Sequence, residues 1–543
     1  MLFFNKAVRK GGILMLSKHI QENSKRTAVT DSYTFEYLIE KNLLYVDKTE
    51  YLYKLIASNK KLFFFSRPRR FGKSLTLSTL KAIFQGKKEL FKDLYIENQP
   101  YDWKPYPVIH LDLGSNTAFT PNELEEELSS LVKRCAREYS IELTETRSGK
   151  QFEELIIKLY ERDGNVVILI DEYDKPILNN IEKENITDFQ AKMKGFYSVL
   201  KTCEPYERFV FITGVGKFLK VSIFSDLNNL NDISMSDDYA AMCGYTEKEL
   251  KDNFPTQLKE ASKQYDFDYE TFLQKVKEWY DGYRFSRKSE NVYNPVSLAK
   301  FLENHGDFSN YWFETGSPSI IIKKINKTAS FSIEKLLKET HPADIFTAFA
   351  PAEFSIIALM YQTGYLTIKD TEKIGLETFY RIGFPNYEVK QSFYRRLISS
   401  FNNENYIGDS LYLNLIKAIK SNDIDKMMSV IDSYLAGIPN NIQIENEKYF
   451  QTVFFCIFSL IGASITAEVC TSDGRIDAVI DNGDNVYIFE FKLNKSGRIA
   501  MKQIMQKEYY KKYENSGKQI TLVGANFDFE TRRLGKWTIK QVG

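Results

Sequence analysis

The chain has 543 residues, and at roughly 150 residues per domain this length predicts about three to four domains. Hydrophobic residues make up 43% of it, and the 27 glycines bring the total into the usual globular range of roughly 45 to 50%, which excludes disorder, collagen and membrane bundles. The net charge is only +1, so any surface for nucleic acid or anionic lipid must be local.

The five cysteines and four histidines are dispersed, so neither a zinc site nor a disulfide framework is expected, and a reducing cytoplasm is the predicted location. Residues 1–16 contain no apolar run of signal-peptide length, and Met15 is an alternative start to Met1. The uncharged run 450–467 is long enough to consider a membrane span. Its polar residues and Gly462 favour a buried helix, a stop and a buried strand, so we expect no membrane partner.

Short apolar runs alternate with amphipathic stretches through roughly the first 220 residues. This alternation predicts an α/β fold with a parallel sheet covered by helices. The predicted strands are Leu62–Phe65, Val108–Leu113, Val166–Ile170 and Phe209–Thr213.

The first strand leads into a loop, Arg67–Phe71, and then into a helix that extends to about Gln85. This is the pattern of a P-loop, in which backbone N–H groups and the helix N-terminus face phosphates, a lysine reaches the β and γ oxygens, and a serine hydroxyl binds Mg²⁺. We therefore expect a nucleotide site at Arg69, Arg70, Phe71, Gly72, Lys73 and Ser74, with Ser74 also a metal ligand.

The loop departs from the G-x-x-x-x-G-K-S pattern because Arg67 occupies the position of the first glycine, where a left-handed turn would be strained. The alternative interpretation is a basic surface turn whose arginines and lysine are simply solvated.

The strand Val166–Ile170 ends in two acidic residues. We expect Asp171 to hold Mg²⁺, directly or through water, and Glu172 to polarise the water that attacks the γ-phosphate. The alternative is an ordinary acidic helix N-terminus. The strand that ends at Thr213 offers this residue as a polar sensor beside the γ-phosphate.

From about residue 250 to 400 the pattern is mainly helical, with Tyr269–Tyr280 the clearest helix. A helix at Phe354–Tyr361, followed by strand-like runs at Tyr365–Ile368 and Thr378–Ile382, predicts a winged-helix-like hairpin within a helical lid. The Asn-rich stretches 401–409 and 437–448 are the best linker candidates.

Near the C-terminus, 475–480 and 486–492 are predicted strands joined by a turn that contains Asn-Gly, a strong hairpin signal. If Ile480 pairs with Asn485, Asp477 faces Ile488, and the alternation of side chains places Asp477, Glu490 and Lys492 on one face.

Two carboxylates in this arrangement bind Mg²⁺ or Mn²⁺, while a lysine holds the attacking water or the scissile phosphate. The alternative is an edge-strand ion pair of Glu490 with Lys492, with Asp477 merely exposed. Residues 492–540 carry 12 lysines and arginines against 4 acidic residues, a basic flank that suits a phosphodiester substrate.

From about residue 30 the sequence resembles the AAA-ATPase-like proteins of bacteria and archaea that carry a C-terminal PD-(D/E)XK nuclease domain. The motifs that carry the resemblance are Tyr45-Val46-Asp47-Lys48-Thr49, Ser66-Arg67-Pro68-Arg69-Arg70-Phe71-Gly72-Lys73-Ser74, Leu169-Ile170-Asp171-Glu172-Tyr173-Asp174-Lys175-Pro176, Phe211-Ile212-Thr213-Gly214-Val215, Ser225-Asp226-Leu227-Asn228-Asn229-Leu230 and Trp279-Tyr280-Asp281-Gly282-Tyr283-Arg284-Phe285.

The family shares the Arg-Pro-Arg-Arg-Phe loop, so the resemblance implies that the missing glycine is a family trait. The D-x12-E-x-K pattern of Asp477, Glu490 and Lys492 resembles the nuclease core. Glu447 matches an acid that some members add, and Gln503 resembles a family glutamine near the site. The family pattern identifies no arginine finger, for which Lys217, Arg284 and Arg287 are eligible.

The predicted fold is therefore α/β: a P-loop ATPase with a parallel sheet, a mainly helical lid with a winged-helix-like hairpin, and a small C-terminal restriction-endonuclease-like domain. The expected divisions are a tail (1–30), the ATPase domain (31–250), the lid (251–400), a helical linker (401–440) and the nuclease-like domain (441–543).

The predicted function is a cytoplasmic ATPase coupled to a metal-dependent nuclease, with ATP and Mg²⁺ or Mn²⁺ as cofactors, in defence or mobile-element biology. Nucleic acid is the expected partner, DNA in preference to RNA, and a homo-oligomer is left open. The alternative is a switch or scaffold that binds ATP without turnover and binds nucleic acid without cutting it.

Overall fold

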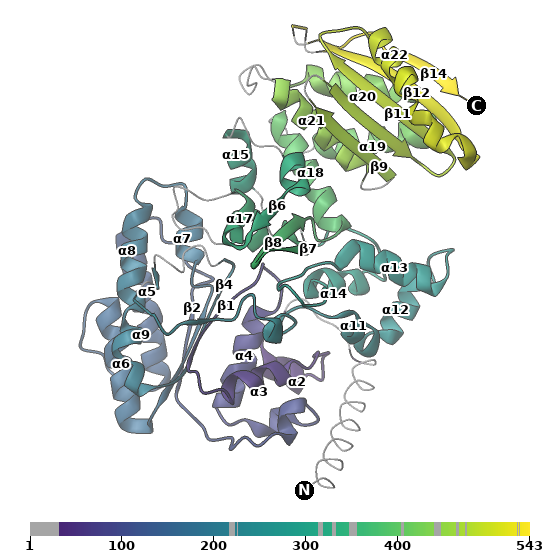
Figure 1. The fold of residues 1–543 in the computed structure, drawn as a ribbon. Helices are drawn as coiled ribbons and strands as arrows, with labels where there is room; N and C mark the ends of the chain where they lie inside the picture. The colour runs from purple at the N-terminus through teal and green to yellow at the C-terminus, as the bar shows by residue number, and fades with distance from the viewer. Residues whose placement is uncertain are drawn as a thin grey trace. The chain divides into compact units, whose positions relative to one another are not determined.

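The computed structural model describes residues 26, 32–216, 223–224, 226–312, 319–327, 333–346, 356–402, 407–438, 447–462, 466–472, 475–528, 530–531 and 533–542 (Figure 1). Met1, Met15, Lys217 and Ser225 lie outside these residues, as do the side chains of Glu447 and Asp477. The chain divides into two compact units: unit 1 comprises residues 1–314 and 340–386, and unit 2 comprises residues 315–339 and 387–543.

The core of unit 1 is a five-stranded parallel sheet with the strand order β2-β3-β4-β1-β5, which confirms the expected α/β fold. Its strands are β1 (Leu62–Ser66), β2 (Val108–Asp112), β3 (Val166–Asp171), β4 (Glu207–Gly214) and β5 (Asn231–Asp232). Every residue of β3 is buried, as expected for a parallel strand covered on both faces. Because the strands are parallel, the residues that follow β1, β3 and β4 meet at one edge.

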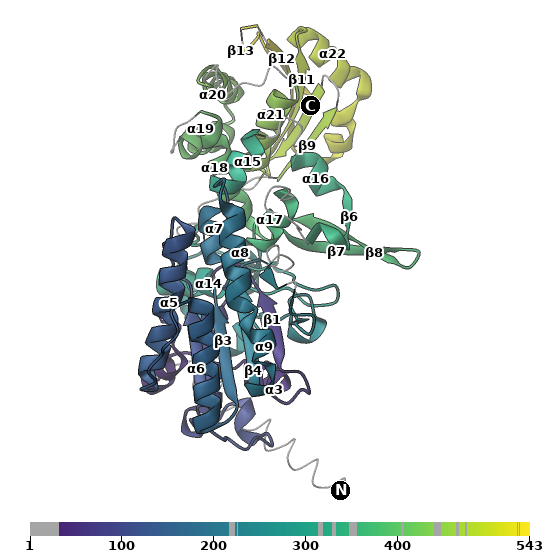
Figure 2. The same ribbon diagram turned by 90° about the vertical axis from the view of Figure 1, so that its left-hand side faces the viewer.

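Helices cover both faces of this sheet (Figures 1 and 2). Helix α4 (Lys73–Phe84) packs against β3 and β4 on one face, and α5 (Pro121–Glu138) and α6 (Ser148–Asp163) pack against β2 and β3 on the other. The remaining helices of this part are α2 (Phe35–Glu40), α3 (Thr49–Ile56), α7 (Lys175–Asn180), α8 (Ile186–Tyr197) and α9 (Val199–Thr202).

The rest of unit 1 is mainly helical, and α13 spans Tyr269–Tyr280, the bounds expected from the sequence. The Asp268 side chain caps it by accepting a hydrogen bond from the backbone N–H of Thr271. Its inner face joins an aromatic core that includes Phe272 and Phe301. The neighbouring helices are α11 (Glu247–Asn253), α12 (Pro255–Ser262), α14 (Pro295–Glu303) and α17 (Ile356–Gln362).

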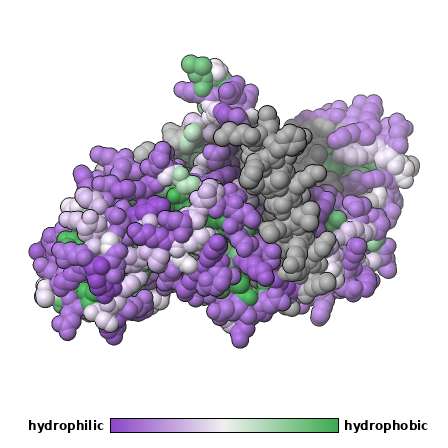
Figure 3. Space-filling model, turned by 90° about the horizontal axis from the view of Figure 1, so that it is seen from below, coloured by the Kyte–Doolittle hydropathy of each residue, from purple (hydrophilic) through white to green (hydrophobic). Residues whose placement is uncertain are grey.

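Strands β7 (Thr367–Ile374) and β8 (Glu377–Gly383) form the expected hairpin, which projects from the unit in Figure 2, and β6 (Thr340–Pro342) pairs with β8. Both hairpin strands extend beyond the apolar runs that predicted them. The residues nearer the turn are mostly exposed and many are charged, so they show no apolar pattern in the sequence. Exposed Ile374 is the last residue of β7, and exposed Leu376 lies in the turn. The face drawn in Figure 3 is otherwise largely hydrophilic, with small separate apolar patches among the described residues.

Unit 2 is built around a six-stranded sheet in the order β13-β12-β11-β10-β9, with β14 paired to β12. Its strands are β9 (Thr466–Ser472), β10 (Arg475–Asp481), β11 (Asn485–Leu493), β12 (Gln519–Asp528), β13 (Arg533–Leu534) and β14 (Thr538–Val542). Its helices are α15 (Ser319–Lys327), α16 (Ile333–Lys338), α18 (Tyr387–Phe401), α19 (Ile407–Lys420), α20 (Ile424–Ala436), α21 (Glu447–Ile461) and α22 (Gly497–Lys507).

Helices α19 and α20, within the range expected to be a linker, are attached to this sheet. Asp432 of α20 accepts hydrogen bonds from the side chain of Arg533 and from the backbone N–H of Leu534. Asn422, between the two helices, accepts one from the hydroxyl of Tyr487 on β11. The expected domain limits remain predictions.

Helix α21 ends before Gly462, whose N–H donates to the carbonyl of Phe458, and residues 453–461 of the helix are buried. Among the described residues, no helix is long and apolar enough to span a membrane.

The β10–β11 register differs by two residues from the expected one. Ile480 pairs with Tyr487 and not with Asn485, because the turn lies at 482–485, where the N–H of Asn482 donates to the carbonyl of Asn485. As a result Asp477 pairs with Glu490 instead of Ile488. A shift by an even number leaves position 477 on the same face as Glu490 and Lys492.

Glu207, the first residue of β4, supplies a pH-dependent contribution to stability. Its side chain is 2% exposed, and burial, with a smaller contribution from Glu204, raises its pKa from 4.5 to about 8. The folded chain therefore binds a proton that the unfolded chain releases between about pH 4.5 and pH 8, so this residue lowers stability as pH rises through that window.

Glu207→Gln should raise Tm relative to the wild type more at pH 9 than at pH 6. The corresponding difference in the free energy of unfolding is up to a few kcal/mol, at about 1.4 kcal/mol per pKa unit. Thermal melts of the full chain at the two pH values measure this difference. Glu161→Gln, on the exposed part of α6, should shift Tm equally at both. An equal shift for Glu207→Gln would contradict the assignment.

Candidate functional site

The loop between β1 and α4 has two left-handed residues, Gly72 (φ 93°) and Arg70 (φ 68°). Arg67 is not one of them, so the strain expected at the position of the missing glycine does not occur. Both Arg67 and Lys73 are buried, with exposed fractions of 2% and 6%. The alternative of a solvated basic turn therefore does not describe this loop.

Lys73 is turned toward the loop itself. Its Nζ donates to the carbonyl oxygens of Arg67 and Pro68, each at 3.0 Å. Gly72 is the N-cap of α4, and the first N–H groups of a helix have no partner within it. The ammonium of Lys73 and the N-terminus of α4 thus lie together after β1. Both are groups to which a phosphate can bind.

The Asp171 carboxylate is the centre of the site, and it is buried. Its Oδ2 accepts from the hydroxyl of Ser74 at 2.5 Å, and its Oδ1 accepts from the hydroxyl of Thr213 at 2.5 Å and the N–H of Glu172 at 3.0 Å. Because β4 lies between β1 and β3, Thr213 is placed between the loop and the acidic strand. Three of the residues expected at this site are therefore in direct contact.

The carboxylate of Glu172 lies outside the contact group of Ser74, Asp171 and Thr213. It has a left-handed backbone (φ 50°), and its Oε2 lies 3.9 Å from Nζ of Lys175. The same oxygen is 3.2 Å from where a Cβ at Gly114 would lie, just after β2. Since β2 and β4 flank β3 on opposite sides, the Glu172 carboxylate is directed away from the P-loop strand.

Asp174, which the sequence did not single out as a site residue, joins the ends of β3 and β4. Its side chain is fully buried, and its Oδ2 accepts from the N–H groups of Val215 and Gly216 at 3.0 and 2.9 Å. Burial raises its pKa to about 6 despite these bonds. The only signal available in the sequence was the second aspartate in Asp-Glu-Tyr-Asp.

The other loop residues contact the helical part of unit 1. Arg69 is half-buried, and Nη1 of Arg70 donates to the carbonyl of Tyr311 at 3.1 Å. Phe71 is buried with its ring edge-to-face against Tyr283, at 4.8 Å between centroids.

In unit 2, Glu490 and Lys492 are both buried within β11, with exposed fractions of 0% and 7%. The ammonium of Lys492 is 2.8 Å from Oε1 of Glu490. Asp477 is the direct cross-strand partner of Glu490. The site residues expected on one face thus occupy adjacent positions of the sheet, in the centre and not on an edge strand.

Helices α21 and α22 cover opposite faces of β11. Rings of α21 pack on Phe489 and Phe491, whereas α22 packs on the face of Val486 and Ile488, which Glu490 shares. The close approach of α22 depends on Gly524, the β12 partner of Glu490, where a Cβ would lie 2.6 Å from backbone atoms of α22. Gln503 is half-buried on α22, and Glu447 is the first residue of α21.

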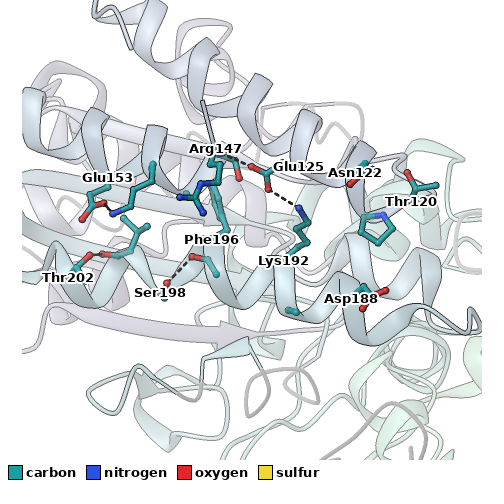
Figure 4. Close-up of a pocket in the computed structure, with 17 residues that line it drawn as sticks. Thr120, Asn122, Glu125, Arg147, Glu153, Asp188, Lys192, Phe196, Ser198 and Thr202 are labelled. Atoms are coloured by element: carbon teal, nitrogen blue, oxygen red, sulfur yellow. Dashed lines mark hydrogen bonds and ion pairs between the residues drawn. The ribbon is translucent and has the colours of Figure 1, made fainter. Parts of the chain in front are cut away.

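A groove of about 840 Å³ lies on the outer helices, between the N-terminal ends of α5 and α6 and the side of α8 (Figure 4). Two of its three cations are paired with carboxylates: Lys192 with Glu125 at 3.8 Å and Lys150 with Glu153 at 2.6 Å. The other Glu125 oxygen already accepts from the N–H of Ser148, at the start of α6. This mixed charge does not favour a phosphate group, and the groove shares no residue with the P-loop site.

The fold therefore defines a P-loop protein of the ATPase type joined to a second, smaller α/β unit. Residues 31–224 match the family model described as "Predicted AAA-ATPase", and residues 445–537 match that of the PD-(D/E)XK nuclease superfamily.

An "Uncharacterized protein in vnfD 5'region" of Azotobacter chroococcum mcd 1 is 34% identical over 511 residues, covering 92% of this chain and 96% of that protein. The chain belongs to this family of AAA-ATPase-like proteins with a C-terminal PD-(D/E)XK nuclease superfamily domain. The Aeropyrum pernix ORC2 protein, solved in ADPNP and ADP complexes, is 11% identical, with 62% of this chain and 88% of that chain covered. Its TM-score of 0.27 is too low to establish a shared fold.

Proposed function

We propose that this chain is a cytoplasmic, ATP-dependent nuclease: unit 1 binds and hydrolyses ATP with Mg²⁺, and unit 2 cuts nucleic acid, DNA in preference to RNA, with Mg²⁺ or Mn²⁺. A role in defence or mobile-element biology fits this activity. The observation that carries the proposal is the cross-strand pairing of position 477 with Glu490, which is fully buried beside Lys492, because two acidic residues paired on neighbouring strands call for a cation.

The ATP half is supported by the oxygen-only donor set around Asp171. The Ser74 hydroxyl and the Asp171 carboxylate are already in contact, and both are ligand types that Mg²⁺ accepts. A bound Mg²⁺ would neutralise phosphate charge, while Lys73 would leave its loop carbonyls to contact the phosphate oxygens.

The nuclease half is supported by the chemistry of the paired strands and their flank. Asp477 and Glu490 would hold the divalent ion, which supplies Lewis-acid activation of the phosphodiester and its attacking water. Lys492 would orient that water or the scissile phosphate. The lysines and arginines that follow β11 would bind the nucleic acid backbone, an interaction that weakens with salt.

A second candidate function is a nucleotide-dependent switch that binds ATP without hydrolysing it. The observation that favours it is the Glu172 carboxylate, which is directed to Lys175 and Gly114 and away from the Ser74–Asp171–Thr213 contact group. Hydrolysis requires Glu172 to turn toward the γ-phosphate, whereas the switch does not.

Lys73→Ala should weaken ATP binding by at least about tenfold, because it removes a charge-assisted contact to the phosphates. Glu172→Gln should retain binding and lose hydrolysis. Calorimetry with Mg²⁺-ATP and a phosphate-release assay measure the two steps. Lys81→Ala, on the same helix α4, is the matched control and should leave both unchanged; equal affinity of Lys73→Ala and wild type would contradict the site.

Asp477→Asn and Glu490→Gln should each reduce cleavage of DNA by at least about 100-fold, the scale expected when a preorganised charge is lost from a phosphodiester site. The assay uses the full chain with single- and double-stranded DNA and RNA, with Mg²⁺ or Mn²⁺, with and without ATP. Asp481→Asn removes an acid of the same strand that is paired with Lys518, and should retain activity. Cleavage by Glu490→Gln at the wild-type rate would contradict the proposal.

A further inference from the structure

The side chain that replaces the first P-loop glycine is itself an internal anchor. Nη1 of Arg67 donates to the carbonyls of Ser66 at 2.9 Å and Ser234 at 2.6 Å, and Nη2 donates to those of Tyr239 and Ala240, each at 3.3 Å. Burial lowers its pKa only to about 10, so the guanidinium stays charged at neutral pH.

Two aromatic rings enclose this guanidinium. Its carbon lies 4.3 Å from the centroid of Phe65, on β1, and 4.2 Å from that of Phe285, more than 200 residues away in the sequence. Contacts of this kind become stronger when they are desolvated. Arg67 therefore joins the loop to the Gly282–Phe285 segment of the helical part of unit 1.

Two further loop residues contact the same part of the unit. Phe71 packs edge-to-face on both Tyr283 and Phe285, at 4.8 and 5.2 Å. Pro68 lies so close to Gly364 that a Cβ at position 364 would be 2.8 Å from the ring of Pro68. The P-loop is thus enclosed by elements far from it in sequence, and it cannot change conformation independently of them.

The segment that contacts Arg67 is in turn attached to the hairpin and to the end of unit 1. The N–H of Arg284 donates to the hydroxyl of Thr367, at the start of β7, at 2.7 Å, and that hydroxyl donates to the carbonyl of Arg284 at 3.1 Å. The glycine at 282 allows the carbonyl of Pro385 to lie 2.1 Å from where a Cβ would be. Lys369 of β7 also donates to that carbonyl at 2.8 Å, and the chain enters unit 2 just after Asn386.

The loop end of this connection is hydrogen-bonded to Lys73. The Arg67 carbonyl accepts a hydrogen bond from Nζ of Lys73, the group that a nucleotide phosphate would attract. Phosphate binding would therefore free the Arg67 and Pro68 carbonyls from Lys73. The packing of the loop against Phe285 would then change.

We propose that Arg67 is a positioning residue that couples nucleotide binding at Lys73 to the Gly282–Phe285 segment and through it to Pro385, where the chain leaves unit 1. The proposal rests on the ATP site proposed above. It gives the nucleotide state a physical route to the junction with the nuclease-like unit.

Hydrogen exchange of the full chain, with and without Mg²⁺-ATP, tests this coupling after calorimetry has measured binding. In the wild type, ATP should slow exchange of the N–H groups of residues 282–285 and 367–385 by about tenfold, a typical size for coupling between sites. Arg67→Lys keeps the charge but cannot reach four carbonyls between two rings, and it should lose this ATP-dependent change.

Phe285→Leu removes the stacked ring with a smaller risk to folding and should lose the change as well. Phe272→Leu makes the same substitution in the aromatic core around α13, and it should keep the ATP-dependent change despite a lower Tm. Loss of the change in Phe272→Leu, or its retention in both Arg67→Lys and Phe285→Leu, overturns the proposal. If the wild type binds ATP without slower exchange at 282–285, only the proposed coupling is wrong. If the wild type binds no ATP, both the proposed ATP site and the coupling are wrong.

Discussion

A carboxylate buried in a sheet must be compensated, and this requirement organises both sites. Asp171 is compensated by the hydroxyls of Ser74 and Thr213 and by the N–H of Glu172. Glu490 is compensated by the ammonium of Lys492. An uncompensated charge at either position would cost several kcal/mol, so each carboxylate fixes the residues around it. Such preorganised groups are suited to bind a cation with little rearrangement, which is why the same feature supports the proposed chemistry at both places.

The Arg67 anchor shows the same constraint for a cation. Both terminal nitrogens of its guanidinium donate to carbonyl oxygens and two aromatic rings enclose it, and its hydrogen bonds within the described part of the chain include no carboxylate. A glycine at this position would give the loop freedom, whereas arginine ties the loop to Phe285. The family membership and the structure together indicate an ATPase-like unit. The P-loop of this unit packs against its helical part.

Much of the fold follows from the sequence because buried parallel strands are continuous apolar runs, and β1 to β4 were each predicted within a few residues. Helix α13 was predicted to the residue because Asp268 caps it and the apolar period is clear. The predicted hairpin register was wrong by two residues, since Asn482 and not Asp481 begins the turn. Because the shift is even, positions 477, 490 and 492 still share one face of the sheet. Asp174, Gly524 and the contacts of Arg67 could not be predicted, because each depends on residues distant in sequence.

Asp477 and Glu490 are the residues proposed to form a divalent metal site beside Lys492. Its most direct test is a Mn²⁺ titration of the full chain without nucleotide, followed by electron paramagnetic resonance of the free and bound ion. Bound Mn²⁺ is expected in the wild type and in Lys492→Ala, and this binding should be lost in Glu490→Gln. The same Mn²⁺ binding in Glu490→Gln as in the wild type would rule out the proposed metal site.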